Sequence, residues 1–314
     1  MLKRKITEKI LISVGAIFAC FLIYLIPSNK NDTIDVISIP KEEVKKSNIY
    51  LLDNNNMLGK TSVIVNNSDT ISLAFELLDI LIIGGKGESS IPSGFRSLIP
   101  SDVIVNGITF LNGILKIDFN KCFKDINEYE MSIIESIIYT LTEIPEVSGI
   151  EITIEGEILN RLPSNIVIPK YLDRSFGINK KYNLTSLDNI KGVTTYYVGK
   201  FNDDTYYVPV TSYVNDERDK IKIIIENLSG SNTYMTNLMS YINSNTKLID
   251  VNIENDKMML TFNSYILNDF DKLNILEEVI DTISLSVKDN YDVSEVIFYV
   301  DNNEICKSVL KTLE

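Results

Sequence analysis

A stretch of sequence that occurs twice is the feature that most constrains the fold of this chain. The first copy reads Ile114-Leu-Lys-Ile-Asp-Phe-Asn120, then an apolar helix pattern, then Tyr139-Thr-Leu-Thr-Glu-Ile-Pro-Glu-Val147. The second copy reads Lys257-Met-Met-Leu-Thr-Phe-Asn263, then another helix pattern, then Asp292-Val-Ser-Glu-Val-Ile-Phe-Tyr299. The spacing between equivalent residues changes only slightly along the stretch, as one small insertion would cause. The sequence therefore predicts a duplicated domain, with two copies of a small module built from strands and helices.

Each copy shows the element order strand-strand-helix-strand-strand-helix-strand. In the first copy, Leu111-Asn112-Gly113 separates two alternating apolar runs, which is a strong short-range signal for a hairpin. Ser68-Asp69-Thr70 offers caps for the first helix and Gly84-Gly85 a stop, and apolar residues at three- and four-residue spacing predict both helices. The alternating strands favour an antiparallel or mixed sheet with one buried and one wet face. We expect an α+β fold, in which each module is a sandwich of one sheet with its two helices on one face. The strands expected in this copy are 48–52, 61–65, 103–110, 114–119 and 147–154.

The second copy repeats this order more faintly. Residues 158–193, between the copies, mix polar residues with prolines and glycines, so part should extend the first sheet and part should be linker. The elements expected in the second copy are strands 195–198, 206–211, 248–253, 257–262 and 293–300 and helices 218–228 and 273–287.

An uninterrupted apolar run from Ile10 to Ile26 follows a basic segment that contains Lys3, Arg4 and Lys5. A helix over this run would be roughly 25 Å long, near the short end of the range that spans a bilayer. The basic flank is expected to stay inside the cell, which places the rest of the chain outside the cytoplasm. We therefore predict an uncleaved signal anchor, that is, a single-pass transmembrane helix in the cell membrane.

Two alternatives stay open for the apolar run. A cleaved signal peptide would have a shorter apolar core and a clean small-residue cleavage site. A lipoprotein signal would place a small residue directly before a cysteine, as Ala19 stands before Cys20, although Phe18 is bulky and the chain stays apolar after the cysteine. Cys20 is therefore a candidate lipid-attachment site. With an anchor or a lipid alike, the remaining chain would be tethered to the outer face of the membrane.

The expected organisation follows from these patterns. It comprises a cytoplasmic basic segment (1–9), the anchor (10–26), a polar linker (27–47), the first module (48–157), an inter-domain segment (158–193), the divergent second module (194–306) and a tail (307–314).

Composition excludes several classes of function. The formal net charge of −13 argues against nucleic acid as a partner, because phosphate binding needs clustered lysine and arginine. The chain contains no histidine, which excludes Ser-His-Asp and Cys-His catalytic arrangements and zinc sites with histidine ligands. Cys122 and Cys306 belong to different copies, so a disulfide would have to cross domains, and we expect both thiols to be free.

The polar motifs of the chain have ordinary structural explanations. Gly84-Gly-Lys-Gly-Glu-Ser-Ser90 lacks the spacing of a phosphate-binding loop and follows a helix. Asp53-Asn-Asn-Asn-Met-Leu-Gly59 resembles the start of a calcium loop, but the later ligand positions are apolar, so we expect a hairpin turn. The tyrosines of the 195–211 hairpin suit cross-strand pairing, and a tyrosine-lined sugar-binding surface is the alternative. The sequence thus predicts no catalytic site, no cofactor and no metal. The tyrosines concerned are Tyr196, Tyr197, Tyr206 and Tyr207.

The first copy carries a recognisable set of residues at fixed spacing. The strand Gly113–Phe119, the segment Tyr139-Thr-Leu-Thr-Glu143 and the closing strand up to Gly156 resemble the GerMN domain of the GerM family of bacterial sporulation and spore-germination proteins. The family often has Gly-Pro where this chain has Gly84-Gly85. The signature residues, to which a structural role is assigned, are Asp118, Phe119, Tyr139, Thr140, Leu141, Thr142, Pro145, Val147 and Gly156.

The second copy matches the same family more weakly. Asp281-Thr-Ile-Ser-Leu285 stands in place of Tyr139–Glu143, and Lys288-Asp-Asn-Tyr291 reads as an insertion before the last strand. We interpret the loss of the signature as a change of surface residues on a core that has been retained. The two modules are therefore expected to contact different neighbouring proteins.

The resemblance implies a non-enzymatic role in endospore formation or germination. Proteins of the GerM family lie between the mother-cell and forespore membranes, where they help assemble or hold an envelope-spanning complex. Expected partners are therefore other sporulation envelope proteins of the channel type, reached by protein–protein contact, together with the membrane itself. The alternative is a module that binds the cell wall (peptidoglycan) or a germinant. A wall-modifying enzyme that uses paired carboxylates is a further and less favoured alternative.

Overall fold

The computed structural model describes residues 45–126, 128–230, 237–269 and 271–310. The expected anchor at 10–26, Cys20 and nearly all of the polar linker lie outside the described residues. Of the helices that the structure describes, none combines the length and apolar character needed to cross a bilayer.

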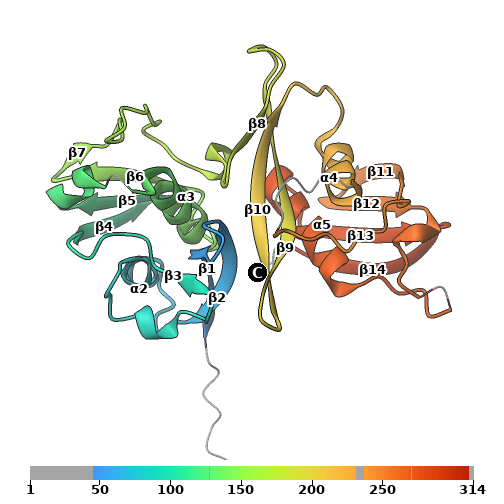
Figure 1. The fold of residues 1–314 in the computed structure, drawn as a ribbon, viewed down its shortest axis with the longest axis horizontal. Coiled ribbons are helices and arrows are strands. Elements are labelled where there is room, and N and C mark those ends of the chain that lie inside the picture. Colours follow the sequence, from blue (N-terminus) through green and yellow to red (C-terminus); the bar gives the residue numbers. More distant parts are fainter. Residues whose placement is uncertain (1–44, 127, 231–236, 270, 311–314) are drawn as a thin grey trace, which may run out of the picture. The chain divides into compact units, whose positions relative to one another are not determined.

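Two modules of similar element order make up the described chain (Figure 1). The first module contains β1 (Lys46–Asp53), β2 (Leu58–Ile64), α2 (Thr70–Leu81), β3 (Phe95–Arg96), β4 (Val105–Leu111), β5 (Ile114–Phe119), α3 (Glu130–Leu141), β6 (Gly149–Ile154) and β7 (Glu157–Ile158). The inter-module segment, residues 159–190, contains the short helix η3 (Arg174–Phe176) and β8 (Lys181–Asn183). The second module contains β9 (Lys191–Phe201), β10 (Asp204–Val214), α4 (Lys220–Ser229), β11 (Leu248–Glu254), β12 (Lys257–Phe262), α5 (Glu277–Asn290), β13 (Glu295–Val300) and β14 (Asn303–Val309). The other short elements are 3-10 helices, namely η1 (Glu88–Ser90), η2 (Lys121–Asp125) and η4 (Ser264–Ile266).

A four-stranded mixed sheet forms the outer layer of each module. The order is β4-β5-β6-β7 in the first module and β11-β12-β13-β14 in the second. The β4–β5 hairpin turns at Asn112 and Gly113, whose φ angles of 51° and 78° require residues that tolerate the left-handed region. The hairpin predicted there is confirmed. β5 and β6 run parallel, which their connection through α3 allows.

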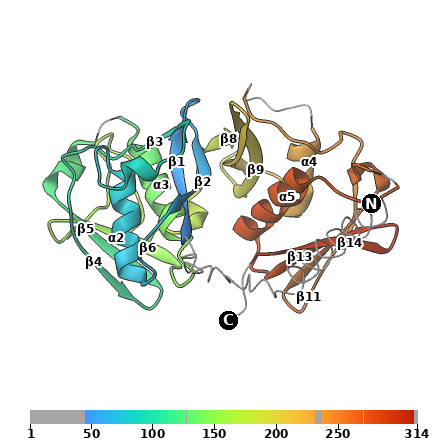
Figure 2. The same cartoon turned by 90° about the horizontal axis from the view of Figure 1, so that it is seen from below.

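The prediction of one sheet per module was wrong. The first hairpin of each module leaves the outer sheet and joins a third sheet of order β3-β1-β2-β10-β8, with β9 paired to β10. In β1, Ile49 to Asp53 are all buried, so this strand has no wet face of the kind that an alternating strand would have. One of its faces is covered by α3, which packs between β1 and β6. The helices therefore lie between a hairpin and an outer sheet, as Figure 2 shows for α3 and for α5.

Local signals placed the helices well. Asp69 caps α2 by accepting a hydrogen bond from the Ser72 backbone N–H at 2.9 Å, as the Ser68-Asp69-Thr70 motif predicted. The helix ends at Leu81, ahead of the expected stop at Gly84-Gly85. Each module has its own apolar core, with Phe119 stacked on Phe123 in the first and Phe262 on Phe298 in the second.

Candidate functional site at the junction of the two modules

The two modules meet through equivalent strands. Lys60 of β2 pairs with Tyr207 of β10 in antiparallel direction. Within the hairpins, Tyr50 pairs with Lys60 and Tyr196 pairs with Pro209, so β2 and β10 occupy the same place in their modules. Antiparallel pairing of equivalent strands is the arrangement that a two-fold axis produces. The junction therefore has the geometry of a symmetric dimer contained in one chain.

Hydrogen bonds on either side of the junction repeat the same relation. The Tyr50 backbone N–H donates to Thr140 Oγ1 at 3.0 Å, and the Tyr196 backbone N–H donates to Ser286 Oγ at 2.9 Å. Both pairs are 90 residues apart in sequence. The first strand of each module is thus tied to the second helix of that module by a hydroxyl side chain at the same position.

Two tyrosines and two carboxylates form the centre of the junction. Tyr50 Oη lies 2.9 Å from Glu143 Oε1, and Tyr196 Oη lies 2.9 Å from Asp289 Oδ2, each pair being 93 residues apart. The two phenolic oxygens also lie 2.9 Å from each other. The two tyrosine hydroxyls thus have only two protons for three oxygen–oxygen contacts, one to each carboxylate and one to each other. Both tyrosine rings are almost fully buried.

Arg174 of the inter-module segment joins the two carboxylates. Its Nη2 lies 2.7 Å from Glu143 Oε1, and its Nη1 lies 2.5 Å from Asp289 Oδ1. The guanidinium also lies over the Tyr139 ring, 4.7 Å from the centroid. A planar guanidinium with two prongs suits a position between two carboxylates, which a single ammonium could not serve equally. One residue from outside both modules thus closes the junction.

Lys60 and Lys288 complete the charge balance around Glu143. Their Nζ atoms lie 3.2 Å from Glu143 Oε1 and Oε2 respectively. Burial opposes ionisation of Glu143, but Arg174 and the two lysines overcome this and hold the pKa of the carboxyl well below its usual range. Burial acts against the charge of Arg174 as well, yet Asp289 and its other neighbours raise the pKa of the guanidinium further above its usual value.

Asn179 fills the place where the two strands stop pairing. Its Nδ2 donates to the carbonyl oxygens of Leu58 and Pro209, at 2.9 and 2.7 Å, and its Oδ1 accepts from the Leu58 N–H at 3.0 Å. Pro209 has no N–H to give to the ladder, so a side-chain amide takes its place. The backbone N–H of Asn179 donates to Glu135 Oε2 at 2.8 Å, and Lys180 Nζ lies 3.5 Å from Glu135 Oε1. Burial raises the pKa of Glu135 to about 7, against the opposing effect of Lys180.

The expected register between the two helices was wrong. Because Ser286 is the equivalent of Thr140 and Asp289 that of Glu143, the counterpart of Tyr139–Glu143 is 285–289 rather than 281–285. The extra residues therefore lie before this part of α5, and Lys288-Asp-Asn-Tyr291 is not an insertion.

The signature residues fall into two groups in the structure. One group lies at the junction. Tyr139 donates its hydroxyl to the Arg174 carbonyl, and Thr140 Oγ1 accepts from the Tyr50 backbone N–H. Thr142 Oγ1 accepts from Arg174 Nε at 3.0 Å. Leu141 is fully buried beside them. The interpretation of the signature as surface identity was therefore wrong for these positions, because they face the inside of the molecule.

The other group holds the outer sheet of the first module. Asp118 accepts hydrogen bonds from Thr153 Oγ1 at 2.7 Å, from the Gly156 N–H at 2.8 Å and from Asn106 Nδ2 at 3.0 Å. The hydrogen bond from Thr153 is the main reason that the pKa of Asp118 lies below its usual value. Phe119 and Val147 are buried, and Pro145 is exposed in the turn that follows α3.

The hairpin tyrosines do not form an exposed sugar-binding surface. Tyr196 is 1% exposed and Tyr206 is 7% exposed. Tyr206 donates its hydroxyl to Asp53 Oδ2 at 2.7 Å, and Tyr207 donates to Asp281 Oδ2 at 2.6 Å. Cross-strand aromatic pairing was also a wrong expectation, since Tyr206 lies opposite Gly199 and Tyr207 opposite Val198. These rings serve the junction instead.

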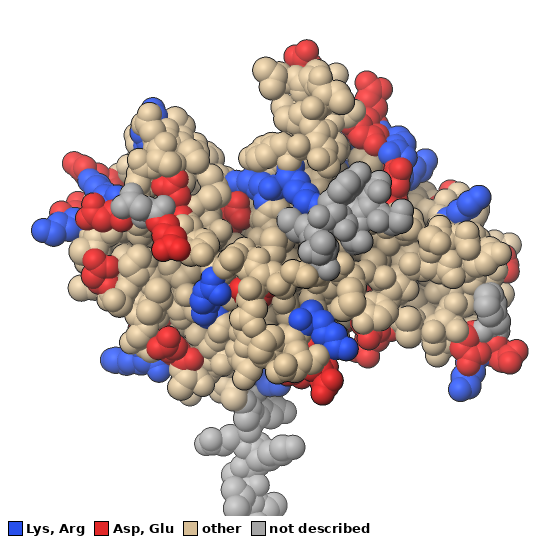
Figure 3. Space-filling view, in the orientation of Figure 1, with Lys and Arg blue, Asp and Glu red and all other residues tan. Residues whose placement is uncertain are grey.

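The remaining motifs have structural roles. Asp53 Oδ1 accepts from the backbone N–H groups of Asn55 and Met57, which makes 53–57 the hairpin turn that was expected. Cys122 and Cys306 are both free thiols, as predicted. In the part of the chain that the structure describes, no cluster of acidic or cysteine side chains has the size needed to hold a metal ion. Basic and acidic side chains are interspersed over the face seen in Figure 3.

Sequence reasoning missed Glu143, Asp289, Arg174 and Asn179 as junction residues. A usable signal did exist for the first two. Tyr50 and Tyr196 each stand 93 residues before a carboxylate, but both tyrosines lie outside the repeated stretch of the sequence. Arg174 and Asn179 have no counterpart in the repeat, so no sequence pattern pointed to them.

A family model described as Germane, sporulation and spore germination, matches residues 48–160 and 194–306. These ranges coincide with the two modules and cover more than half of the chain. The chain belongs to this family. The resemblance to GerMN domains is thereby confirmed for both copies.

Relatives of this Germane chain support the same assignment. The spore germination protein GerM of Bacillus subtilis (strain 168) is 29% identical over 276 residues, which is 86% of this chain and 74% of that protein. The solved tandem GerMN domains of the sporulation protein GerM from Bacillus subtilis match with a TM-score of 0.75 at 28% identity. That match covers 83% of this chain and 92% of the solved chain. The tandem arrangement is therefore shared with a solved member of the family.

Proposed function

We propose that this Germane protein is a non-enzymatic scaffold of endospore formation or germination, anchored in the cell membrane by residues 10–26. In this proposal the two modules lie outside the cytoplasm, in the space between the two membranes of a sporulating cell. There they assemble or stabilise an envelope-spanning complex through contacts with other sporulation envelope proteins. A lipid on Cys20 is the alternative form of the tether.

The main support for this proposal is the junction at which β2, β10 and Arg174 join the two modules. Arg174, Glu143 and Asp289 form a buried ion network that joins both modules and the segment between them. Burying such a network costs desolvation energy, but it can hold the two modules in one fixed relative geometry. A tandem unit of fixed geometry suits a part that spaces or aligns its neighbours.

Charge and chemistry agree with a scaffold. The centre of the junction has its acidic groups neutralised by Arg174, Lys60 and Lys288 and its tyrosine hydroxyls engaged. The buried carboxylates and tyrosine hydroxyls are engaged with these cations and with one another, rather than left free to react with a substrate. The names of the relatives, a spore germination protein and a sporulation protein, support the biological setting.

The test uses sporulating cells that carry fluorescent fusions to the full chain. We expect the wild-type fusion to gather at the envelope of the developing spore, and a fusion lacking residues 195–304 to reach the membrane without gathering there. An Arg174→Ala fusion, which keeps both modules but opens their junction, should gather weakly. Normal gathering and normal yield of heat-resistant spores in the 195–304 deletion would contradict the two-module scaffold.

Binding of cell wall is the second candidate function. It is measured separately by sedimentation of the purified modules with peptidoglycan. A scaffold should stay in the supernatant, whereas saturable pelleting would favour the cell-wall alternative.

A further inference from the structure

A polar groove of about 450 Å³ lies beside the junction, between β2 and α5. Ser62 lines its β2 wall, and Asp281, Ser284 and Lys288 line its α5 wall. Residues 308–310, the last that the structure describes in the second module, lie at its border. None of the roles described above accounts for this β2–α5 groove.

The inter-module segment fills the equivalent groove on the other side of the junction, between β10 and α3. The Thr211 N–H donates to the Ile178 carbonyl at 2.9 Å, and the Ile178 N–H donates to Thr211 Oγ1 at 3.0 Å. β8 then continues along β10 as a parallel strand, with Lys181 opposite Ser212. Extended main chain, added to the edge of a strand, thus fills the β10–α3 groove.

Glu135 of α3 binds the same segment through its side chain. Its Oε2 accepts the Asn179 N–H at 2.8 Å, and its Oε1 lies 3.5 Å from Lys180 Nζ. Lys180 Nζ also lies 3.3 Å from the centroid of the Phe176 ring. The β10–α3 groove therefore accepts an extended segment that presents a lysine to a carboxylate on the helix wall.

The strand walls of the two grooves are equivalent. Lys60 and Pro209 occupy the same place in their hairpins. Ser62 and Thr211, each two residues further along its strand, are therefore equivalent as well. An occupant of the β2–α5 groove would meet Ser62 where Ile178 meets Thr211.

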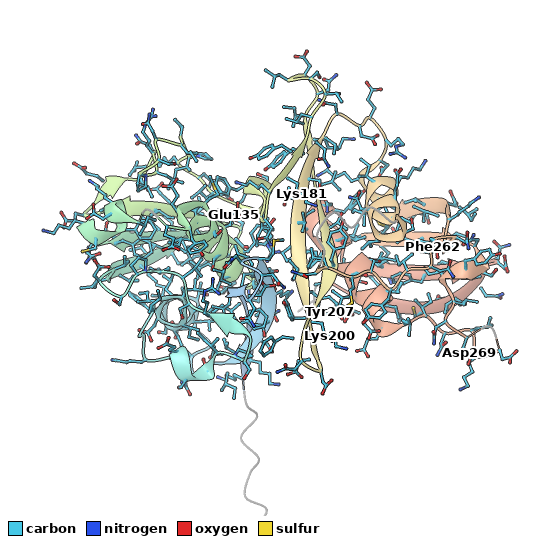
Figure 4. All side chains as sticks on the ribbon, in the orientation of Figure 1. Glu135, Lys181, Lys200, Tyr207, Phe262 and Asp269 are labelled. Atoms are coloured by element: carbon cyan, nitrogen blue, oxygen red, sulfur yellow. The ribbon has the colours of Figure 1, made fainter. Side chains whose placement is uncertain are left out.

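The helix walls are equivalent too. The register set by Thr140 and Ser286 makes Asp281 the counterpart of Glu135. Figure 4 shows Glu135 toward one end of β10 and Tyr207, which borders the β2–α5 groove, toward the other. The two-fold relation therefore places the β2–α5 groove where a second extended segment would lie.

The backbone of β2 is ready to pair in this groove. The Val65 N–H donates to the Lys45 carbonyl on the β1 side. Because N–H groups alternate in direction along a strand, those of Ile64 and Ser62 point away from β1. Among the described strands, only β10 pairs with this edge of β2, and it does so at Lys60 alone. The edge from Ser62 to Ile64 is therefore available for another strand.

The two lysines that line the groove are already paired. Lys60 Nζ and Lys288 Nζ each lie 3.2 Å from an oxygen of Glu143, which Arg174 contacts as well. Both lysines therefore belong to the charge balance of the junction, and they do not set the charge of an occupant.

Asp281 is the remaining charged side chain of the groove, and in the described part of the chain it has no cation as partner. Its Oδ2 accepts the Tyr207 hydroxyl at 2.6 Å, whereas its counterpart Glu135 has Lys180 on one oxygen and a main-chain N–H on the other. Ser284 Oγ, on the same wall, is buried and lacks a hydrogen-bond partner among the described residues. A lysine from an occupant would pair with Asp281 as Lys180 pairs with Glu135.

We propose that the β2–α5 groove binds an extended, lysine-bearing segment of a partner protein, which adds to the free edge of β2 as a parallel strand and sets its lysine against Asp281. The main-chain groups of Ser62 and Ile64 pair with this segment, as the edge of β10 does with the inter-module segment. The segment of this kind that the chain itself contains already fills the β10–α3 groove, so the occupant comes from another protein. The inference rests on the proposed scaffold function only for the identity of the partner, because the binding itself is a property of the purified chain.

The probe for the test is a fluorescein-labelled octapeptide with the sequence of residues 176–183, Phe-Gly-Ile-Asn-Lys-Lys-Tyr-Asn, because this segment fills the equivalent groove. Its binding to the purified protein is measured by fluorescence anisotropy. We expect a Kd of about 100 µM or tighter, and at least about tenfold weaker binding of a second peptide in which glutamate replaces both lysines.

Variants of the protein place the binding in the β2–α5 groove. Ser62→Pro removes the outward N–H without touching the β1–β2 ladder, so it should weaken binding by about fivefold or more. Ser62→Ala keeps that N–H and is the matched control, which should bind as the wild type does. Asp281→Asn should reduce the preference for the lysine peptide over the glutamate peptide, whereas Asp301→Asn, at an exposed turn, should leave it unchanged.

The outcome decides the proposal once circular dichroism and thermal unfolding establish that each variant is folded. Absence of saturable binding at about 1 mM lysine peptide would overturn it. Equal binding by Ser62→Pro and Ser62→Ala, or an unchanged lysine preference in Asp281→Asn, would overturn it as well. Binding that arises only after removal of residues 311–314 would also do so, because the occupant would then be the tail of this chain. The scaffold function is tested in cells and can stand if the peptide does not bind.

Discussion

The phenolic oxygens of Tyr50 and Tyr196 lie 2.9 Å apart, at equivalent positions of the two modules. In a symmetric dimer such a contact would join one residue to its own copy. Here gene duplication supplies both residues, and the two modules have diverged around the contact. Glu143 and Asp289 differ in length, Thr140 and Ser286 differ by a methyl group, and Arg174 belongs to neither module. Covalent linkage permits this asymmetry, because a segment between the modules can supply a single Arg174 to both carboxylates.

Arg174 should be the most sensitive residue of the junction. Its replacement by alanine leaves Glu143 and Asp289 buried without their shared partner, so we expect a loss of about 3–5 kcal/mol in the free energy of unfolding. Arg174→Lys should recover only part, because an ammonium group cannot make the two-pronged contact. Urea denaturation measures both variants. Arg161→Ala, at an exposed arginine whose partner is the nearby Asn165, is the control and should change stability by less than about 0.5 kcal/mol. A loss below about 1 kcal/mol for Arg174→Ala would contradict the role given to this residue.

Tyr50 and Tyr196 should be energetically coupled. Each Tyr→Phe change removes one hydroxyl from the shared set of contacts, and we expect each to cost about 1 kcal/mol. Because the two hydroxyls touch, the double variant should depart from additivity by about 0.5 kcal/mol or more in a double-mutant cycle. Tyr241 is partly exposed and gives the control pair, which should be additive with Tyr50→Phe. Strict additivity of Tyr50→Phe and Tyr196→Phe would show that the contact carries no energy.

Glu135 should make stability depend on pH near neutrality. Its pKa is raised from 4.5 to about 7 by burial, so the folded state binds a proton that the unfolded state has already lost in this window. The corresponding stability is fully present below pH 4.5 and is lost as the pH rises through about 7, by at most about 3 kcal/mol. Glu135→Gln should therefore gain stability relative to the wild type between pH 5 and pH 8. Urea unfolding at several pH values measures this, with exposed Glu157→Gln as control. A constant difference over the whole range would exclude the titration of Glu135.

Asp118 should stabilise the edge of the outer sheet in the first module. Asp118→Ala leaves the Gly156 N–H without its acceptor and leaves Thr153 Oγ1 only its longer contact with the Ile117 carbonyl, for an expected cost of about 1–3 kcal/mol. Asp118→Asn keeps one acceptor oxygen and should cost less. Hydrogen exchange at the Gly156 amide reports the local effect, which should be faster exchange in the alanine variant. Unchanged exchange at Gly156 would mean that this signature residue acts elsewhere.

Local structure could be predicted because its causes are local. The Asn112-Gly113 turn needs positive φ angles, the Asp69 cap satisfies a free N–H of α2, and the apolar stripe of α3 follows helical spacing. These signals act within a few residues, so they can be found in a single sequence. The register of α5 could not be found in this way. Its signature residues have changed, and only the hydrogen bond from Tyr196 to Ser286 places it.

The sequence by itself determined that there are two modules, the order of their elements, the GerMN resemblance and the absence of histidine chemistry. Only the tertiary structure decided which sheet each hairpin joins, that Tyr139–Glu143 faces inward, and that Arg174 closes the junction. The physical reason is the range of the interactions. Turn, cap and periodicity signals come from neighbours in the chain, whereas the pairing of β2 with β10 and the meeting of Glu143 with Asp289 join residues from different modules. Their free energy depends on burial and geometry that exist only once both modules have folded.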